Sequence, residues 1–388
     1  MMTDVVIAGI GQTAVGELWE VSLRELAFYA LEAALEDAGG LRPQALYVGN
    51  MLAPQLSDQA HLGALIADFA GLHGIEALTV EAAGASGGAA LRMGYLAVAS
   101  GQVDAALVVG VEKFSDHVGS GVEAALATTS DSDYEAVQGL TPTAKAALLM
   151  RRYLHEFEAP RAAFAGIPLI AHANGVANPN AMFRKAIKAE VYARAGAVSD
   201  PVNLFDAAPL GDGAAALVLT RSDLLPPQFP HPLVRIAGSA LATDTLALHD
   251  RPDPLSFHAA RLSVERALRR TGAPVSEIDL FELYDAFSIY AIMSLEAAGL
   301  AERGQGWKLA EGDDLSLNGR MPISTMGGLK ARGDAGGATG VYQAVEATLQ
   351  LRGQAGDNQV VNARRALIQC LGGPAASAAT HLLERLDA

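Results

Sequence analysis

The stretch Val80-Glu81-Ala82-Ala83-Gly84-Ala85-Ser86-Gly87-Gly88-Ala89-Ala90 decides how the chain is interpreted. An apolar run leads into a turn rich in glycine and serine, and an alanine-rich segment follows. This order predicts a strand, a loop and the start of a helix. A helix N-terminus favours negative charge and lowers the pKa of a thiol placed there. Gly84, at the centre of the turn, has no side chain with which to attack a substrate.

The composition is that of a globular protein with a large core. The chain has 388 residues, of which 51% are hydrophobic and 18% charged, so we expect about two domain-sized units. Its 28 basic and 43 acidic residues give a formal net charge of -15. This balance argues against a nonspecific phosphate-binding surface, and we expect no nucleic-acid partner.

Cysteine usage and the absence of long apolar runs bear on location. Cys370 is the single cysteine of the chain, which excludes an intramolecular disulfide and fits a reducing compartment. The first six residues lack the basic start and apolar stretch of a signal peptide. No apolar run approaches the roughly 20 residues needed to span a bilayer. We therefore expect a cytoplasmic protein without a membrane span.

The sequence repeats its own pattern. Residues 29–39 and 262–272 both show helical spacing of apolar residues and both end at glycine. An apolar strand is predicted after each, over residues 45–49 and 278–283. The Gly84 turn with its helix also has a counterpart in residues 334–340, so the repeat places Gly84 and Asp334 in equivalent positions.

Two α/β halves follow from this repeat. Short β-branched runs alternating with alanine-rich helices predict parallel sheets covered by helices. The proline-rich residues 226–232 are the best boundary, because proline blocks both helices and central strands. We expect one half over residues 1–228, which contains a strand-poor insertion at about 115–203, and a second half over residues 229–388.

Several long blocks together identify a family resemblance. They resemble the thiolase superfamily, and within it the thiolase-like proteins related to sterol carrier protein thiolases and archaeal acetyl-CoA acetyltransferases. The resemblance runs from about Val5 to Glu384, and the blocks that carry it are residues 5–13, 80–90, 103–113, 172–174, 206–216, 282–287 and 327–334.

The resemblance carries expectations for fold, ligands and assembly. It implies a layered α/β/α/β/α fold, in which the insertion at about 115–203 covers the substrate. It implies a coenzyme A thioester as substrate, with no permanently bound cofactor. It also implies a homodimer formed through an edge strand, which here would be residues 78–81.

Three positions of the family's catalytic set differ in this chain. Where the family has its nucleophilic cysteine, the chain has Gly84, and where it has the histidine of a Gly-His-Pro turn, the chain has Asp334. Where the family has the histidine of a His-Asp-Ala-Phe motif, the chain has Tyr284. Cys370 alone keeps a residue type of the catalytic set, that of the family's second cysteine. A covalent acyl-enzyme through the usual thiolate is therefore excluded. Ser86 lies where the family already has serine, so we assign it a structural role.

With a tyrosine at position 284 of this motif, the chain resembles the thiolase-fold retro-aldolases that shorten sterol side chains. Those enzymes cleave a β-hydroxyacyl-CoA without a covalent intermediate, and they work with a small partner that has a zinc ribbon and an OB fold. The resemblance makes Tyr284, Asp334 and Cys370 the candidate proton carriers.

Each of these three residues also has a structural interpretation. Tyr284 could be a core tyrosine at a strand end, and Asp334 could cap the helix expected from Ala338. Cys370 could be an inert core thiol.

The candidate substrate-binding residues come from the same resemblance. They are Gly84, His172, Asn174, Gly372 and Gly373. No cluster has metal-ligand spacing, and the glycine turns lack the full dinucleotide-binding pattern, so we expect neither a metal nor a nicotinamide site.

Three hypotheses for the function remain open at this point. The first is retro-aldol cleavage of a β-hydroxyacyl-CoA, which the pair of Gly84 and Tyr284 favours. The second is a non-catalytic thiolase-fold scaffold or subunit that binds acyl-CoA. The third is acyl transfer of the acetyl-CoA acetyltransferase type.

Overall fold

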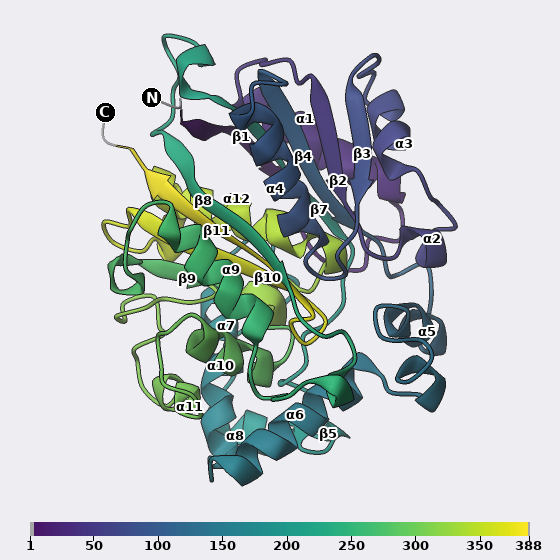
Figure 1. Ribbon diagram of the computed structural model, residues 1–388, viewed down its shortest axis with the longest axis vertical. Helices are drawn as coiled ribbons and strands as arrows, with labels where there is room; N and C mark the ends of the chain where they lie inside the picture. The colour runs from purple at the N-terminus through teal and green to yellow at the C-terminus, as the bar shows by residue number, and fades with distance from the viewer. Residues whose placement is uncertain (1–3, 387–388) are drawn as a thin grey trace.

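A single nine-stranded sheet runs through the computed structural model, which describes residues 4–386 (Figure 1). The strand order is β3-β2-β4-β7-β1-β8-β11-β10-β9. The two halves of the chain meet in one place in this sheet, where Val6 of β1 pairs with Arg235 of β8. The strands are β1 (Val5–Gln12), β2 (Ala45–Gly49), β3 (Glu76–Val80), β4 (Ala105–Glu112), β7 (Gly213–Arg221), β8 (Val234–Thr243), β9 (Leu280–Glu282), β10 (Arg365–Gly372) and β11 (Ser377–Arg385).

The sheet is mixed, which corrects the expectation of parallel sheets. Parallel pairing occurs between β2 and β3, between β2 and β4, and between β9 and β10. The pairs β1–β7, β4–β7, β10–β11 and β8–β11 are antiparallel. The short connection between β10 and β11 explains one of these pairs, because a tight turn joins antiparallel strands whereas parallel strands need a long crossover.

Two helices lie in the central layer between the two halves of the sheet. They are α4 (Ser86–Ala99) and α12 (Thr339–Arg352), which pack against each other and against strands of both halves. Almost every residue of α12 is buried, as a helix enclosed on all sides requires. The outer faces are covered by α1 (Leu23–Asp37) and α3 (Leu62–Phe69) in the first half, and by α9 (His258–Arg269) and α10 (Ser288–Ala297) in the second. The layered α/β/α/β/α arrangement expected from the sequence is confirmed.

The internal repeat is visible in this arrangement. Helix α1 precedes β2 as α9 precedes β9, and α4 and α12 occupy equivalent central positions. Helix α1 begins at Leu23, where Ser22 and Glu25 form a capping box at its N-terminus.

The N-termini of α4 and α12 approach each other closely through glycine. A Cβ atom on Gly340 would lie 2.3 Å from the backbone nitrogen of Gly88, and one on Gly87 would lie 2.8 Å from the carbonyl oxygen of Gly337. The two loops that precede these helices, which carry Gly84 and Asp334, are therefore brought to the same place.

A mainly helical segment fills the chain between β4 and β7. In Figure 1 most of its helices lie at the lower end of the molecule, beside the second half of the sheet. Its elements are α5 (Ser120–Ala127), α6 (Pro142–Glu156), α7 (Gly166–Gly175), α8 (Ala189–Ala193), β5 (Ala197–Ser199) and β6 (Val202–Asn203).

The remaining elements are short. They are the helices α2 (Ala53–Leu56) and α11 (Gly306–Ala310), a π-helical turn (Gly328–Arg332), and 3-10 turns at Ala136–Gln138, Arg161–Ala165, Ser222–Leu224, Leu248–Asp250, Val275–Glu277, Gly336–Ala338 and Gly356–Asn358. Within residues 4–386, no helix has the length and apolar character to cross a membrane.

Candidate active site

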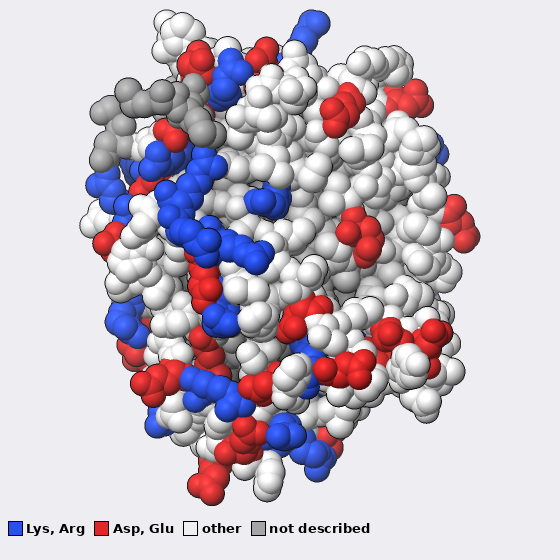
Figure 2. All heavy atoms as spheres, viewed as in Figure 1, with Lys and Arg blue, Asp and Glu red and all other residues white. Residues whose placement is uncertain are grey.

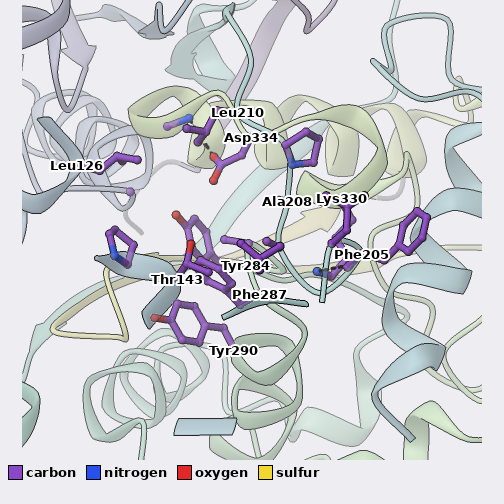
Figure 3. Close-up of a pocket in the computed structure, with 18 of the residues that line it drawn as sticks. Leu126, Thr143, Phe205, Ala208, Leu210, Tyr284, Phe287, Tyr290, Lys330 and Asp334 are labelled. Atoms are coloured by element: carbon purple, nitrogen blue, oxygen red, sulfur yellow. Dashed lines mark hydrogen bonds between the residues drawn. The ribbon is translucent and has the colours of Figure 1, made fainter. Parts of the chain in front are cut away.

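A cavity of about 790 Å³ opens where the helical insertion meets the two central loops (Figure 3). Gly84, Asp334 and Gly336 come from the central loops, and Tyr284 and Phe287 from the segment between β9 and α10. The insertion contributes most of the remaining wall, with residues including Leu126, Thr143, Lys145, His172, Phe183, Arg184, Lys185 and Phe205. Both halves of the chain and the insertion therefore contribute to this site.

Tyr284 fills the space in which a side chain at position 84 would stand. A Cβ atom on Gly84 would lie 2.5 Å from the hydroxyl oxygen of Tyr284 and 2.6 Å from the carbonyl oxygen of Leu371. Both distances are too short for real contacts, so glycine at 84 and tyrosine at 284 depend on each other. The Tyr284 side chain is buried but lines the cavity, and its hydroxyl forms no hydrogen bond within residues 4–386.

The Tyr284 hydroxyl is a proton donor in this environment. Burial, and next the negative charge of Asp334, raise the pKa of Tyr284 well above its ordinary value of 10. A phenol acts as a general base only when its pKa is lowered, so the structure favours the donor role for Tyr284 over the basic one.

Asp334 both anchors the turn before α12 and lines the cavity. Its Oδ1 accepts hydrogen bonds from the backbone nitrogen of Gly336 at 3.0 Å and from the hydroxyl of Thr339 at 3.2 Å, so it ties down the turn before α12. Oδ2 accepts no hydrogen bond from any residue in the described chain, and Asp334 lines the cavity. Burial raises the pKa of Asp334 to about 6, against the opposing effects of Gly336, Arg332 and Thr339. A carboxylate with this pKa is ionised at neutral pH and can accept a proton.

Cys370 does not line the cavity but lies close to it. Its sulfur points between the central helices, 3.7 Å from the carbonyl oxygen of Ala85 and 3.9 Å from that of Ala379. Burial raises the pKa of the Cys370 thiol to about 12. The thiol is near enough to Tyr284 to affect the pKa of that phenol, so its role as a proton carrier stays a prediction.

The five candidate substrate-binding residues divide into two groups. Gly84, Gly373 and His172 line the cavity, whereas Asn174 and Gly372 do not. The Asn174 amide donates instead to the carbonyl oxygens of Ile323 at 3.2 Å and Ser324 at 3.0 Å.

Gly372 keeps the β10–β11 turn close to the Gly84 loop. A Cβ atom on Gly372 would lie 2.2 Å from the Ser377 hydroxyl and 2.7 Å from the carbonyl oxygen of Ala82.

His172 forms part of an aromatic wall. Its ring stacks on Phe183 with centroids 6.0 Å apart, and it meets the edge of Phe205 at 5.8 Å. Burial, and more weakly the charge of Lys330, lower the pKa of His172. Its imidazole is therefore neutral at physiological pH, and its place on this wall fits a role in packing against a substrate.

Lys330 is a cavity residue that the sequence analysis missed. It lies in the π-helical turn after β9, and its ammonium group donates to the carbonyl oxygens of Asp206 at 2.7 Å and Phe205 at 3.2 Å. Burial lowers the pKa of Lys330 to about 8. The sequence signal that could have indicated Lys330 as a site residue was its place in the glycine-rich block at residues 327–334. Within the described chain, no group of three or more histidine, cysteine or acidic side chains is arranged to hold a metal ion.

Comparison with known protein families identifies the family to which the chain belongs. The family model described as "Thiolase, N-terminal domain" matches residues 5–223, and "Thiolase C-terminal domain-like" matches residues 240–385. The chain belongs to the thiolase family.

Relatives with family names agree with this result. The chain is 41% identical to "Acetyl-CoA acetyltransferase" of Methanothermobacter thermautotrophicus, over 99% of this chain and 100% of that protein. It is 29% identical to "Benzoylsuccinyl-CoA thiolase subunit BbsB" of Thauera aromatica, over 92% of this chain and 91% of the relative. At the level of the family, this is a thiolase-type enzyme of acyl-CoA chemistry.

Solved thiolase structures share the fold. The "Ltp2-ChsH2(DUF35) aldolase" superposes with a TM-score of 0.83 over 99% of this chain and 98% of the other, at 23% identity. Human mitochondrial 3-ketoacyl-CoA thiolase in complex with CoA gives a TM-score of 0.74 over 100% and 99% of the two chains, at 17% identity. The fold is that of a thiolase.

We expect Gly84→Ala to lower the free energy of unfolding by about 1–3 kcal/mol, because the new methyl group would overlap the Tyr284 hydroxyl. In a Tyr284→Phe background the same substitution should cost less, since the 2.5 Å contact with the hydroxyl is removed. Urea denaturation of the four proteins of this cycle measures the coupling. Gly312→Ala is the matched control, because a Cβ atom at 312 meets nothing within 4 Å. An equal cost in both backgrounds would contradict the mutual dependence of the two residues.

Proposed function

We propose that this protein cleaves the carbon–carbon bond next to the thioester of a β-hydroxyacyl-CoA by a retro-aldol reaction, without a covalent acyl-enzyme. One observation carries the proposal: the space of a side chain at position 84 is taken by the Tyr284 hydroxyl, 2.5 Å from where a Cβ atom would stand. A protonated phenol can donate a proton but cannot hold an acyl group as a thiolate does.

The rim of the cavity supports a coenzyme A ligand. Arg184 and Lys185 are exposed where they line the cavity, and neither forms an ion pair within residues 4–386. Guanidinium and ammonium groups are the usual partners of phosphate oxygens. In the proposal they bind the phosphates of coenzyme A, the thioester lies near Tyr284, and no permanent cofactor takes part.

Asp334 begins the proposed reaction. Its free Oδ2 takes the proton of the β-hydroxyl group, and the oxygen then forms a carbonyl as the bond between Cα and Cβ breaks. The electron pair of that bond passes to the thioester as an enolate. An ionised carboxylate in an apolar cavity is suited to this step, because its raised pKa makes it a better base than an exposed aspartate.

Tyr284 completes the proposed reaction. Its hydroxyl donates a hydrogen bond to the developing enolate and then gives its proton to Cα, which yields the shortened acyl-CoA. The proton held by Asp334 restores the phenol. The products are an aldehyde or ketone and an acyl-CoA, whose atoms together are those of the substrate, so no oxidant or water is consumed.

Two other functions remain as alternatives to be tested. Acyl transfer of the kind named for the 41% identical relative would need a nucleophile, and the sole cysteine, Cys370, does not line the cavity. A scaffold that binds acyl-CoA would keep the cationic rim without turnover. The ionised carboxylate and the unpartnered phenol that face one cavity favour catalysis over the scaffold.

A homodimer through β3 is part of the proposal. This strand is at the edge of the sheet and is largely exposed, and Leu78 is 48% exposed on it. Met93 and Leu96 of the neighbouring α4 are also exposed apolar residues. Figure 2 shows few charged side chains on the face that carries these elements. An unpaired, weakly charged edge strand favours pairing with a second copy.

A small partner protein with a zinc ribbon and an OB fold is a further part of the proposal. Its support is the structural neighbour called "Ltp2-ChsH2(DUF35) aldolase", whose name joins an aldolase to a DUF35 component. We expect such a partner to raise the activity of the chain rather than to supply the proton carriers, since Tyr284 and Asp334 are both present here.

We expect Tyr284→Phe to lower the rate of β-hydroxyacyl-CoA cleavage by about 10²–10⁴-fold, because the proton donor is lost while the ring still fills the space beside Gly84. The measurement is chromatography with mass spectrometry of acyl-CoA products over a series of chain lengths. Tyr134→Phe is the matched control, since Tyr134 is exposed and does not line the cavity. Cleavage at the unaltered rate in Tyr284→Phe would refute the proposed role.

The rate should depend on pH through Asp334. Because the base must be deprotonated, we expect kcat/KM to rise as the pH increases through about 6, the pKa to which burial raises Asp334. The Tyr284 donor, whose pKa is raised, should impose no fall in rate up to mildly alkaline pH. The Asp334→Asn variant should lose this rising limb together with most of the activity, whereas Asp313→Asn, an exposed control, should keep both. A profile that is flat across pH 6 would speak against Asp334 as the base.

A further inference from the structure

A second tyrosine presents an unpartnered hydroxyl to the same cavity. Tyr290 lies on α10 and is only 2% exposed, and its ring packs against Phe287 with centroids 5.0 Å apart. Its hydroxyl forms no hydrogen bond within residues 4–386, although Tyr290 lines the cavity. In the view of Figure 3, Tyr290 lies below Tyr284 and Phe287, at the opposite end of the labelled group from Asp334. The hydroxyl is therefore a donor available to a ligand oxygen in the cavity, which would gain the net free energy of one hydrogen bond.

A buried lysine lies at the same end of the cavity. Lys145 of α6 is 3% exposed, and its ammonium group donates to the Ser130 hydroxyl at 2.6 Å and to Glu135 at 3.2 Å. An ammonium group has three donors, so one N–H of Lys145 remains for a ligand. Thr143, which lies two residues before Lys145 on α6, also lines the cavity.

Lys145 and Tyr290 share their charged neighbours. Burial chiefly sets the raised pKa of Tyr290, and Arg251 and Glu135 are both close enough to modify it. The same two residues act on the lowered pKa of Lys145, after burial. Helices α6 and α10, which carry the two residues, pack against each other, and both side chains line the one cavity.

The residues that line this part of the cavity favour a neutral ligand group. Lys145 is the cation on this part of the wall, and its ion pair with Glu135 already neutralises it. Arg251 lies behind the wall, where it donates to the carbonyl oxygens of Thr245 and Pro374 while its Nη2 has no partner in the described chain. A carboxylate brought here would lose its hydration without contacting an unpaired cation on the wall, whereas a keto or hydroxyl oxygen needs only the two donors.

We propose that the acyl chain carries a neutral oxygen acceptor, a keto or hydroxyl group beyond its β-carbon, which is bound by the Tyr290 hydroxyl and the free N–H of Lys145. This inference rests on the proposed function, because it requires that an acyl-CoA occupies the cavity. It narrows the substrate class to oxygenated acyl chains, and it makes Tyr290 and Lys145 the residues that determine this specificity.

Calorimetric titration of the full chain tests the inference with ligands that cannot react. The probes are saturated acyl-CoAs without a β-hydroxyl group, each compared with a chain of equal length that has one keto group, moved stepwise outward from the β-carbon. We expect one position of the keto group to lower Kd by about three- to tenfold, the gain typical of one net hydrogen bond. The Tyr290→Phe variant should lose this gain, and Tyr29→Phe, an exposed tyrosine on α1, should keep it.

A second variant protects the test against misfolding. Lys145→Met combined with Glu135→Gln removes the donor together with the charge of its ion-pair partner, and it should also reduce the preference for the keto chain. Equal affinity for plain and keto chains at every position would overturn the inference and leave the proposed function standing. A preference only for an ω-carboxy chain would overturn it as well, in favour of an anionic substrate. If no acyl-CoA binds at all, the proposed function fails together with the inference.

Discussion

The close contact between the N-termini of the two central helices is the constraint on which the site depends. Glycines at positions 87 and 340 let α4 and α12 approach until backbone meets backbone, and a Cβ atom at either position would overlap the facing chain. Because each helix follows its own loop, the contact brings Gly84 from one half of the chain and Asp334 from the other to a common cavity. The helical insertion then covers this meeting point and encloses about 790 Å³. The internal repeat of the sequence thus becomes, in three dimensions, a two-sided active site.

At this meeting point the phenol of Tyr284 occupies the space in which a side chain at position 84 would stand. The relation is steric, because the Tyr284 hydroxyl lies 2.5 Å from where a Cβ of residue 84 would be. The site also separates two protonation states, because the raised pKa of Tyr284 keeps the phenol protonated while Asp334, with a pKa of about 6, is ionised at neutral pH. An aldol cleavage requires one proton donor and one proton acceptor at the reacting carbon atoms, and both face this cavity. A covalent acyl transfer requires a nucleophile instead.

The sequence was sufficient for the architecture and for the centre of the site, because both follow from repeated local patterns. The equivalence of Gly84 and Asp334 could be predicted from the repeat, and the structure brings both to the cavity. The position of the Cys370 thiol between the central helices could not, because it depends on how β10 packs against α4 and α12. Tyr290 and Lys145 were missed because the packing of α6 against α10, which lie far apart in the chain, brings both to the cavity. The protonation of Tyr284 likewise depends on burial, which a single sequence does not specify.

The most direct test of the account measures where the transferred proton ends up, rather than how fast the substrate is cleaved. The protein is incubated in deuterated water with a β-hydroxyacyl-CoA, and NMR of the products is combined with intact mass spectrometry of the protein. The account predicts an aldehyde or ketone, a shortened acyl-CoA with one deuterium at its α-carbon, and a protein of unchanged mass at every time point. An acyl adduct on the protein, or the absence of cleavage products across all chain lengths with and without a zinc-ribbon partner, would contradict the claim that Tyr284 and Asp334 carry out a non-covalent retro-aldol reaction.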